Sequence, residues 1–186
     1  LEISYFARLN NYSKTVADNF LNSLNNAKAI IIDLRYGMGG SPEMVGHIAC
    51  HFFKTKIHFS SIYIRSENVT VDYFTKIDLS YNTLVDKPLY ILCSYKTFSA
   101  AEGFIYAMQN LKRATIVGET TRGGAHTVSY RPLGYGFICD IPFGNVFNPV
   151  TKKNWEGVGI KPDVSSKSED ALETAENIIL DKWNEK

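Results

Sequence analysis

The chain has 186 residues, 45% of them hydrophobic, and a formal net charge of +1 at pH 7. This size and composition predict a single globular domain, and the near-zero charge gives no electrostatic reason to expect nucleic acid as a partner. No apolar run approaches the roughly 20 residues of a membrane-spanning helix. Three cysteines, Cys50, Cys93 and Cys139, lie in apolar stretches, so we expect buried thiols rather than a disulfide framework.

The first half of the chain alternates between strand and helix patterns. In chain order the predicted elements are a strand over residues 2–9, a helix from a cap at Ser13 to residues 25–26, a strand over 27–34, a helix from Pro42 to about Phe53, and two strands over 57–79. The strand over 27–34 is the most apolar of these and ends in a turn rich in glycine.

The second half is organised around the stretch from Pro88 to Thr127. Residues 88–93 are continuously apolar, which suits a strand covered on both faces. After a polar break Ser99 opens a helix, and a further strand leads into a turn with two glycines. The remaining predicted elements are a hairpin over residues 128–149, a closely shaped loop over 152–164, and a last helix capped by Ser168. Strands and helices that alternate in this way are typical of an α/β domain.

Ser99 stands where a strand runs into a helix, and two interpretations of it are open. A helix N-terminus leaves amide N–H groups pointing out of the backbone, and enzymes place nucleophilic hydroxyls at such positions. Alternatively, Ser99 and Glu102 have the spacing of a capping box, in which the two side chains satisfy N–H groups at the helix start.

Two adjacent glycines, Gly39 and Gly40, follow the strand over 27–34. A nucleotide-binding loop is one interpretation, but the lysine of a P-loop and the spacing of a dinucleotide fingerprint are both missing. Paired glycines also let the backbone approach a ligand and direct an N–H group at it, as an oxyanion hole requires. A tight strand-to-helix turn accounts for them too, and both can hold at once.

Two histidines, His47 and His51, are four residues apart on a predicted helix. A metalloprotease helix needs a glutamate directly after the first histidine, and Ile48 stands there. We therefore expect a partly buried packing pair rather than a metal site.

Two further side chains are candidates for proton transfer. His126 follows the turn with two glycines and is either a general base near Ser99 or an ordinary loop histidine. Glu156 lies in the closely shaped loop, where it either orients a histidine or a water molecule or is a solvated carboxylate.

Four segments, in this order, resemble motifs of the tail-specific, or C-terminal-processing, serine peptidase family. The resemblance is strongest to the branch of tricorn protease and interphotoreceptor retinoid-binding protein. The matching segments are Asp33–Gly40, Thr97–Glu102, Gly118–Ala125 and Trp155–Asp163, with Gly37 where the family usually has asparagine.

The resemblance implies an α/β fold of the Clp-protease and crotonase kind, built of stacked strand–strand–helix units. It implies a serine endopeptidase that cleaves unfolded or C-terminal protein segments through an acyl-enzyme, without a cofactor or a metal. By this resemblance Ser99 is the nucleophile, Glu156 is the acidic member of the catalytic set, and amides of Ala100 and of Gly39 or Gly40 form the oxyanion hole. The implied partner is a protein or peptide substrate, in the periplasm or outside the cell.

The chain departs from the family's patterns in its catalytic base. Members with a serine–lysine dyad carry the lysine where this chain has Gly124, so that dyad is absent. The other branch takes a histidine from a segment upstream of the part seen here. Residues 1–186 are therefore expected to be a catalytic core without the N-terminal helical portion and any PDZ portion, in which His126 is the only substitute base considered.

Two other functions stay open beside the peptidase. A binding module that has lost catalysis, as in the retinoid-binding relative, is compatible with the missing lysine, whereas the intact Ser99 and Glu156 favour an enzyme. A crotonase-type enzyme acting on acyl thioesters would also use an oxyanion hole of backbone amides, but this function does not account for the motif around Ser99.

Overall fold

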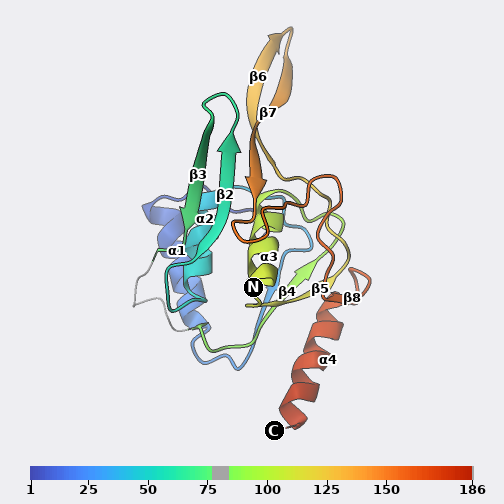
Figure 1. Cartoon of the computed structure of the whole chain (residues 1–186). Coiled ribbons are helices and arrows are strands. Elements are labelled where there is room, and N and C mark those ends of the chain that lie inside the picture. The colour runs from blue at the N-terminus through green and yellow to red at the C-terminus, as the bar shows by residue number, and fades with distance from the viewer. Residues whose placement is uncertain (77–83, 186) are drawn as a thin grey trace.

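The structure, a computed structural model, describes residues 1–76 and 84–185, so the end of the predicted two-strand region, residues 77–79, lies outside the described residues. The described part forms four α-helices and two sheets (Figure 1). In chain order the elements are α1 (Asn11–Ser23), β1 (Ile30–Asp33), α2 (Pro42–Cys50), β2 (His58–Ile64), β3 (Val69–Phe74), β4 (Leu89–Cys93), α3 (Ala100–Asn110), β5 (Thr115–Gly118), β6 (His126–Gly134), β7 (Phe137–Phe147), β8 (Val164–Ser165) and α4 (Ala171–Asn184). None of the described helices is both long and apolar enough to cross a membrane.

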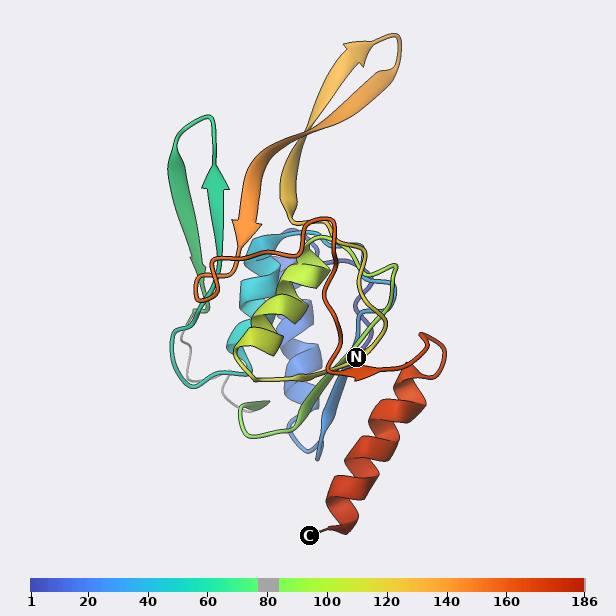
Figure 2. The same cartoon turned by 45° about the vertical axis from the view of Figure 1, so that its right-hand side comes forward.

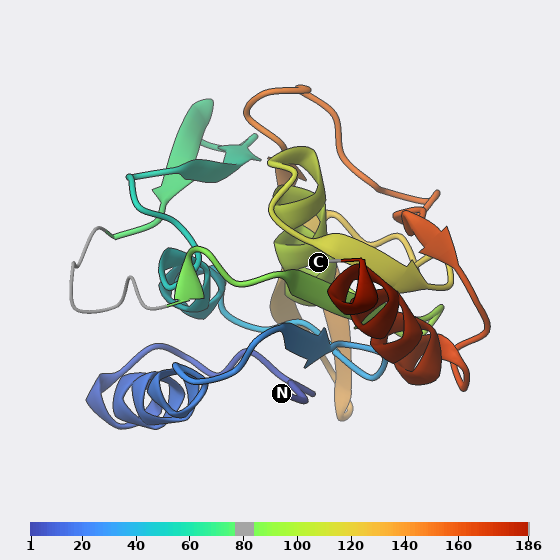
Figure 3. The same ribbon diagram turned by 90° about the horizontal axis from the view of Figure 1, so that it is seen from below.

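One sheet is parallel, with its strands in the order β1–β4–β5–β8. Strand β4 is buried along its whole length and sends alternate side chains to opposite faces. Leu89, Ile91 and Cys93 join the core that contains residues of α2 and α3. Tyr90 and Leu92 pack with α4 on the other face (Figure 3). The sheet therefore lies between two helical layers, as the continuous apolar pattern of this strand predicts.

The second sheet is antiparallel, with its strands in the order β3–β2–β7–β6. It consists of two hairpins joined by pairing of β2 with β7, and both hairpins project from the same side of the domain (Figures 1 and 2). Strand β6 begins at His126, which pairs with Asn145 of β7. The hairpin therefore fixes the backbone of this histidine where the second sheet meets the first.

The turns that carry the candidate residues follow the carboxyl ends of neighbouring parallel strands. Gly39 and Gly40 come after β1, Ser99 comes after β4, and the turn at Gly123–Gly124 comes after β5. Because these strands are parallel neighbours, the three turns lie at the same edge of the sheet, which is where open α/β sheets bind their ligands.

Most of the predicted elements are confirmed with shorter bounds, but the strand predicted over residues 2–9 is wrong. This segment pairs only at two isolated bridges, Glu2 with Asp33 and Phe6 with Gly40. Four positions separate the two bridging residues on this segment whereas seven separate their partners. A regular ladder cannot continue across that mismatch, which the glycine turn after β1 creates.

Two predicted helix caps are wrong by a few residues. Helix α1 is capped by Asn10, whose Oδ1 accepts a hydrogen bond from Ser13 N–H at 3.0 Å, while Ser13 Oγ accepts one from Asn10 N–H at 3.0 Å. Ser13 thus completes a capping box from inside the helix instead of starting it. Helix α4 begins after Asp170 rather than Ser168. Both sites offer several polar residues in a row, and sequence alone does not choose among them.

The cysteine prediction holds for two of the three thiols. Cys50 and Cys93 are free and buried, as expected, whereas Cys139 is free but only half-buried. Cys139 lies on β7 between the exposed residues Ile138 and Asp140, so its apolar neighbours in the sequence do not bury it.

Candidate active site

Ser99 stands between β4 and α3 in a strained backbone conformation. Its φ of 56° and ψ of −123° lie in a region that residues with a Cβ atom rarely adopt. The Ser99 N–H donates a hydrogen bond to Glu102 Oε2 at 2.8 Å, and its C=O accepts one from Gly103 N–H at 3.0 Å. Such strain persists only where neighbouring contacts hold it, and a strained strand-to-helix turn is how many hydrolases expose a nucleophilic hydroxyl.

Glu102 holds the serine turn against the turn that follows β5. Its side chain is fully buried. Besides the bond from Ser99, Oε2 accepts a hydrogen bond from Gly124 N–H at 2.9 Å. Oε1 accepts hydrogen bonds from Gly123 N–H at 2.7 Å and from Thr121 Oγ1 at 2.6 Å. Sequence reasoning assigned Glu102 to a capping box only; its bonds to the next turn depend on β4 and β5 being neighbours, which the spacing does not reveal.

The glycine pair after β1 approaches Ser99 closely. A Cβ atom on Gly39 would lie 2.8 Å from Ser99 Cβ and 3.1 Å from Ala100 N, so no side chain fits at this position. Gly39 also has a φ of 100°, which favours glycine. The two loops are joined directly, since Phe98 N–H donates to Gly37 C=O at 2.9 Å. The close backbone approach expected of these glycines is therefore present.

Two amide groups beside Ser99 belong to positions without a regular backbone partner. Gly40 bridges to Phe6, whose N–H and C=O bond the residues on either side of Gly40. In such a parallel bridge the central residue directs its own N–H to the opposite side. Ala100 is the first residue of α3, where N–H groups have no acceptor within the helix. Gly40, Ala100 and Ser99 all line the same cleft.

His126 and Glu156 are in direct contact. His126 Nδ1 lies 2.8 Å from Glu156 Oε2, and the same oxygen accepts a hydrogen bond from Ala125 N–H at 2.6 Å. The backbone bond fixes the carboxylate beside the first residue of β6. With Nδ1 directed at the carboxylate, Nε2 lies on the other side of the ring, available to a group in the cleft.

The pKa of Glu156 is lowered from its ordinary value of 4.5. Partial burial by itself raises this pKa, but the hydrogen bonds from Ala125 N–H and from His126, together with the charge of His126, outweigh it. The carboxylate is therefore ionised at neutral pH and can stabilise a protonated imidazole.

The cleft that contains Ser99, Ala100 and His126 has a volume of about 510 Å³. One wall is formed by the turns at the edge of the parallel sheet. The other wall is largely apolar and comes from the second sheet, through Phe59, Ile62, Val71, Tyr73, Phe143 and Val146. Glu156 does not line the cleft; it contacts the Nδ1 atom of His126, which does. The structure thus places Ser99, Ala100, Gly40 and His126 along one cavity, with Gly39 packed against Ser99 outside its lining.

The position at which dyad members carry lysine is closed to a side chain. A Cβ atom on Gly124 would lie 2.2 Å from Phe98 Cε2 and 2.6 Å from Phe98 Cζ. Both backbone groups of Gly124 are also engaged, the N–H with Glu102 and the C=O with Trp155 Nε1 at 3.1 Å. With the Phe98 ring in this position, the turn leaves no room for a side chain at Gly124.

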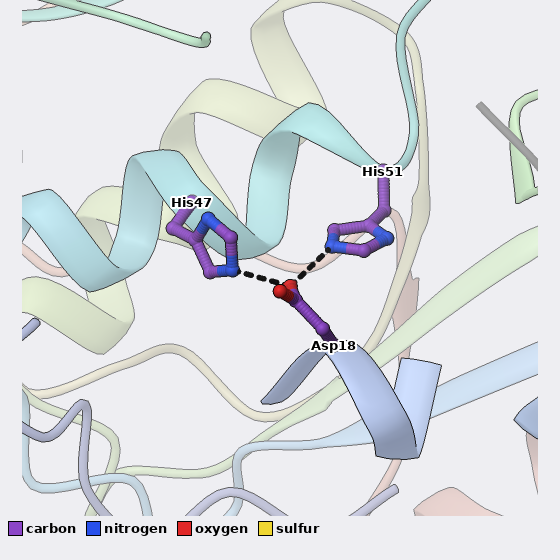
Figure 4. Close-up of side chains that lie close together, drawn as sticks. All are labelled: Asp18, His47 and His51. Carbon is purple, nitrogen blue, oxygen red and sulfur yellow. Dashed lines mark hydrogen bonds and ion pairs between the residues drawn. The ribbon is translucent and has the colours of Figure 1, made fainter. Parts of the chain in front are cut away.

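His47 and His51 do not line this cleft. Both are buried, with ring centroids 5.7 Å apart. Both also contact the carboxylate of Asp18 on α1 (Figure 4). Asp18 was missed because it lies on a different helix, and no sequence spacing connects it to α2.

Comparison with known proteins shows that the chain is similar to peptidases in both sequence and fold. The sequence matches Peptidase family S41 over residues 1–166. The fold is similar to that of photosystem II D1 C-terminal processing protease, with a TM-score of 0.72 and 21% identity over 90% of this chain and 42% of that chain. It is also similar to mature CPAF in complex with lactacystin, with a TM-score of 0.72 and 15% identity over 98% of this chain and 50% of that chain.

A third similar structure is tricorn protease, with a TM-score of 0.53 and 16% identity over 94% of this chain and 16% of that chain. This chain thus spans half or less of the length of each of these three proteins. The shared architecture confirms the predicted Clp-protease and crotonase-like α/β fold.

Proposed function

The chain belongs to peptidase family S41, and we propose that it is a serine peptidase core in which Ser99 attacks the scissile carbonyl and His126, held by Glu156, is the base. One observation carries the proposal: a strained serine, two amide-bearing loops and a carboxylate-bound histidine meet at one cleft. This set supplies a nucleophile, an oxyanion site and a proton acceptor, which are the parts that acyl transfer needs.

In the proposed reaction Ser99 Oγ forms a bond to the carbonyl carbon while its proton passes to His126 Nε2. The negative charge on the carbonyl oxygen is stabilised by N–H groups of Ala100 and of Gly39 or Gly40. The peptide C–N bond then breaks, and the imidazolium returns its proton to the departing amine. Water hydrolyses the resulting ester by the same route, with His126 accepting the proton of the water.

Glu156 has a positioning role in this scheme. Its ionised carboxylate accepts the Nδ1–H of His126, which selects the tautomer with a lone pair on Nε2 and stabilises the imidazolium that forms. The bond from Ala125 N–H keeps the carboxylate in place without the histidine, so a substitution of His126 leaves Glu156 held.

The substrates we propose are unfolded or C-terminal segments of proteins. An extended chain fits a cleft between a row of polar turns and an apolar sheet face, because its backbone can bond to the turns while alternate side chains contact the sheet. Photosystem II D1 C-terminal processing protease, which has a similar fold, is named for its action at a C-terminus. The chemistry uses only side chains and amides of the chain itself.

The test is labelling of the 186-residue protein with a fluorophosphonate probe, together with cleavage of a denatured protein. We expect Ser99→Ala to abolish both, and His126→Ala to lower the rate by about 10⁶-fold, as loss of a catalytic histidine does in serine peptidases. Glu156→Gln should reduce the rate less. His58→Ala, which changes a histidine of β2, is the matched control and should behave as wild type.

The same experiment separates the alternatives. Negligible labelling of the unaltered protein would exclude His126 as the base and favour a histidine from outside this chain. A protein that neither labels nor cleaves, yet binds an apolar peptide or ligand in the cleft, would be a binding module. The apolar wall formed by Phe59, Ile62 and their neighbours is the feature that favours this second function.

A further inference from the structure

A second group of functional side chains lies outside the Ser99 cleft. Asp18 of α1, His47 of α2 and His51, the residue directly after α2, direct their polar atoms at one point, as Figure 4 shows. We call these three residues the Asp18–His47–His51 cluster. None of them lines the proposed active site, and the reaction proposed for Ser99 does not use them.

The cluster arises from helix geometry. His47 lies in the last turn of α2, and His51, four residues later, is the C-cap residue with a helical φ of −67°, so the two side chains lie one turn apart on the same face. Helix α1 packs across α2 and presents Asp18 to that face. Two imidazoles at this spacing form a preorganised pair of nitrogen ligands, and the carboxylate of the second helix provides an oxygen ligand.

The distances within the cluster suit a small cation. Asp18 Oδ1 lies 2.6 Å from His47 Nε2 and 3.4 Å from His51 Nε2. One ligand atom from each of the three residues can be chosen so that all lie within 4.8 Å of one another. Ligands about 2.0–2.1 Å from a tetrahedral zinc ion are roughly 3.4 Å apart. The His51–Asp18 pair already has this spacing, and the His47–Asp18 pair would need to open by less than about 1 Å.

The environment favours ligand atoms that carry lone pairs. The side chains of His47, His51 and Asp18 are 4%, 0% and 14% exposed. Burial lowers the pKa of both histidines, that of His51 to about 4, so neutral imidazoles are favoured at neutral pH. Burial raises the pKa of Asp18, but hydrogen bonds from Lys14 and His47 outweigh this and lower it overall, so the carboxylate is ionised.

Two cations face the cluster. Lys14 lies one turn before Asp18 on α1, and its Nζ is 2.6 Å from Asp18 Oδ2. The positive charge of Lys76, in the segment after β3, lowers the pKa of His47. The Lys14 side chain is 41% exposed, so its ammonium group can turn to solvent when another cation is bound. Lys14 therefore competes with a metal for the carboxylate without closing the site.

We infer that the Asp18–His47–His51 cluster is a binding site for a divalent transition metal, with Zn²⁺ as the best fit, that joins α1 to the end of α2. Two imidazole nitrogens and one carboxylate oxygen are ligands that Zn²⁺ prefers, and a solvent molecule reaching the site beside Asp18 would complete four-coordination. The other interpretation of the same contacts is a hydrogen-bonded cluster that binds no metal.

The test begins with the full 186-residue protein after treatment with a chelator. Zinc is titrated in competition with a chromophoric chelator, and cobalt is added to a second sample. We expect one zinc ion per chain, a higher melting temperature with zinc, and the intense visible bands of four-coordinate cobalt. Binding should weaken by more than about 100-fold in His51→Ala, beyond the loss that follows when a residue merely supports a ligand.

Two further variants sharpen the comparison. His58→Ala removes a histidine of β2 that contacts Asp72 of β3 and is not part of the cluster, so it should leave zinc binding unchanged. Lys14→Met removes the competing cation but no ligand, so it should bind zinc more tightly than the unaltered protein.

The outcomes decide the proposal without relying on one variant. If His51→Ala fails to fold, X-ray absorption of the zinc-loaded unaltered protein must still show two imidazole nitrogens per metal ion. No binding at millimolar zinc, a spectrum without imidazole ligands, or equal weakening by His58→Ala would overturn the site and leave a hydrogen-bonded cluster.

Discussion

The carboxylate of Glu102 accepts a hydrogen bond at 2.8 Å from the N–H of Ser99, the residue three positions before it in the chain. The same carboxylate binds both N–H groups of the Gly123–Gly124 turn. One buried side chain therefore sets the backbone of the proposed nucleophile and the backbone that leads to His126. The relative position of the two depends on this group, although it does not line the cleft.

Glu102→Gln should destabilise the protein and slow labelling of Ser99. The substitution replaces one acceptor oxygen by an NH₂ group, which must then face buried N–H donors. Leaving such donors unsatisfied costs about 3 kcal/mol in the free energy of unfolding. Urea unfolding measures this loss, and a fluorophosphonate probe measures the effect on Ser99.

A control for that substitution is Glu176→Gln, which changes an exposed glutamate of α4. Its unfolding free energy should stay within about 0.5 kcal/mol of wild type. Equal stability of Glu102→Gln and Glu176→Gln would contradict the positioning role of Glu102.

Ser99→Gly should be more stable than Ser99→Ala. Both variants lack the hydroxyl, but alanine keeps the Cβ atom in a conformation with φ of 56° and ψ of −123°. Such strain costs on the order of 1–3 kcal/mol, of which the flexibility of unfolded glycine cancels about 1 kcal/mol. In chemical denaturation we expect the free energy of unfolding of Ser99→Gly to exceed that of Ser99→Ala by about 1 kcal/mol. An alanine variant as stable as the glycine variant, or more so, would mean that the turn relaxes in solution.

Gly124→Lys should destabilise the protein without providing a base. The new Cβ atom would meet the Phe98 ring at 2.2 Å, and forcing extra atoms into a packed site costs about 1–3 kcal/mol. Phe98→Ala in the same chain should recover much of this loss, so a double-mutant cycle reports the clash. Probe labelling of a His126→Ala, Gly124→Lys protein should stay as low as that of His126→Ala alone.

Gly103→Ala is the matched control for Gly124→Lys. Gly103 lies inside α3, and a Cβ atom there would come no closer than 3.5 Å to Trp155. Alanine in a helix is favoured over glycine by about 0.5–1 kcal/mol, so this variant should be at least as stable as wild type. Similar losses for both glycines would show that the Phe98 contact is not the cause.

Sequence patterns predicted three of the four strands of the parallel sheet, β1, β4 and β5, because burial on one or two faces leaves a periodic signal; the two-residue β8 was not predicted. Strand β4 and helix α3 carry that signal clearly, and Phe104, Ile105 and Met108 are fully buried as their spacing requires. The segment over residues 2–9 shows the limit. Phe6 is buried and Tyr5 is exposed, which looks like a strand, yet hydrogen-bond pairing depends on a partner of equal length.

The candidate site, too, was predicted from the sequence only in part. Ser99 and the glycine pair were visible because their local turns require particular residues. The contact of His126 with Glu156 and the bonds of Glu102 to the next turn were not visible as pairs, since they join loops from different strands. Asp18 carried no signal at all, because an exposed helix also places a carboxylate every few residues. Such partners follow from the order of strands and helices in space, which short spacings in sequence do not encode.

The stability that Glu156 contributes should disappear in acid. Its folded pKa lies below the ordinary 4.5, so at intermediate pH the unfolded chain binds a proton that the folded chain does not. The contribution is thus present above about pH 4.5 and is lost as pH falls through the folded pKa. Wild type and Glu156→Gln should differ in unfolding free energy at neutral pH and converge in acid. In NMR titrations, His126→Ala should raise the pKa of Glu156, because one hydrogen bond and one charge that lower it are removed. An unchanged Glu156 titration in His126→Ala would show that the two side chains are not paired in solution.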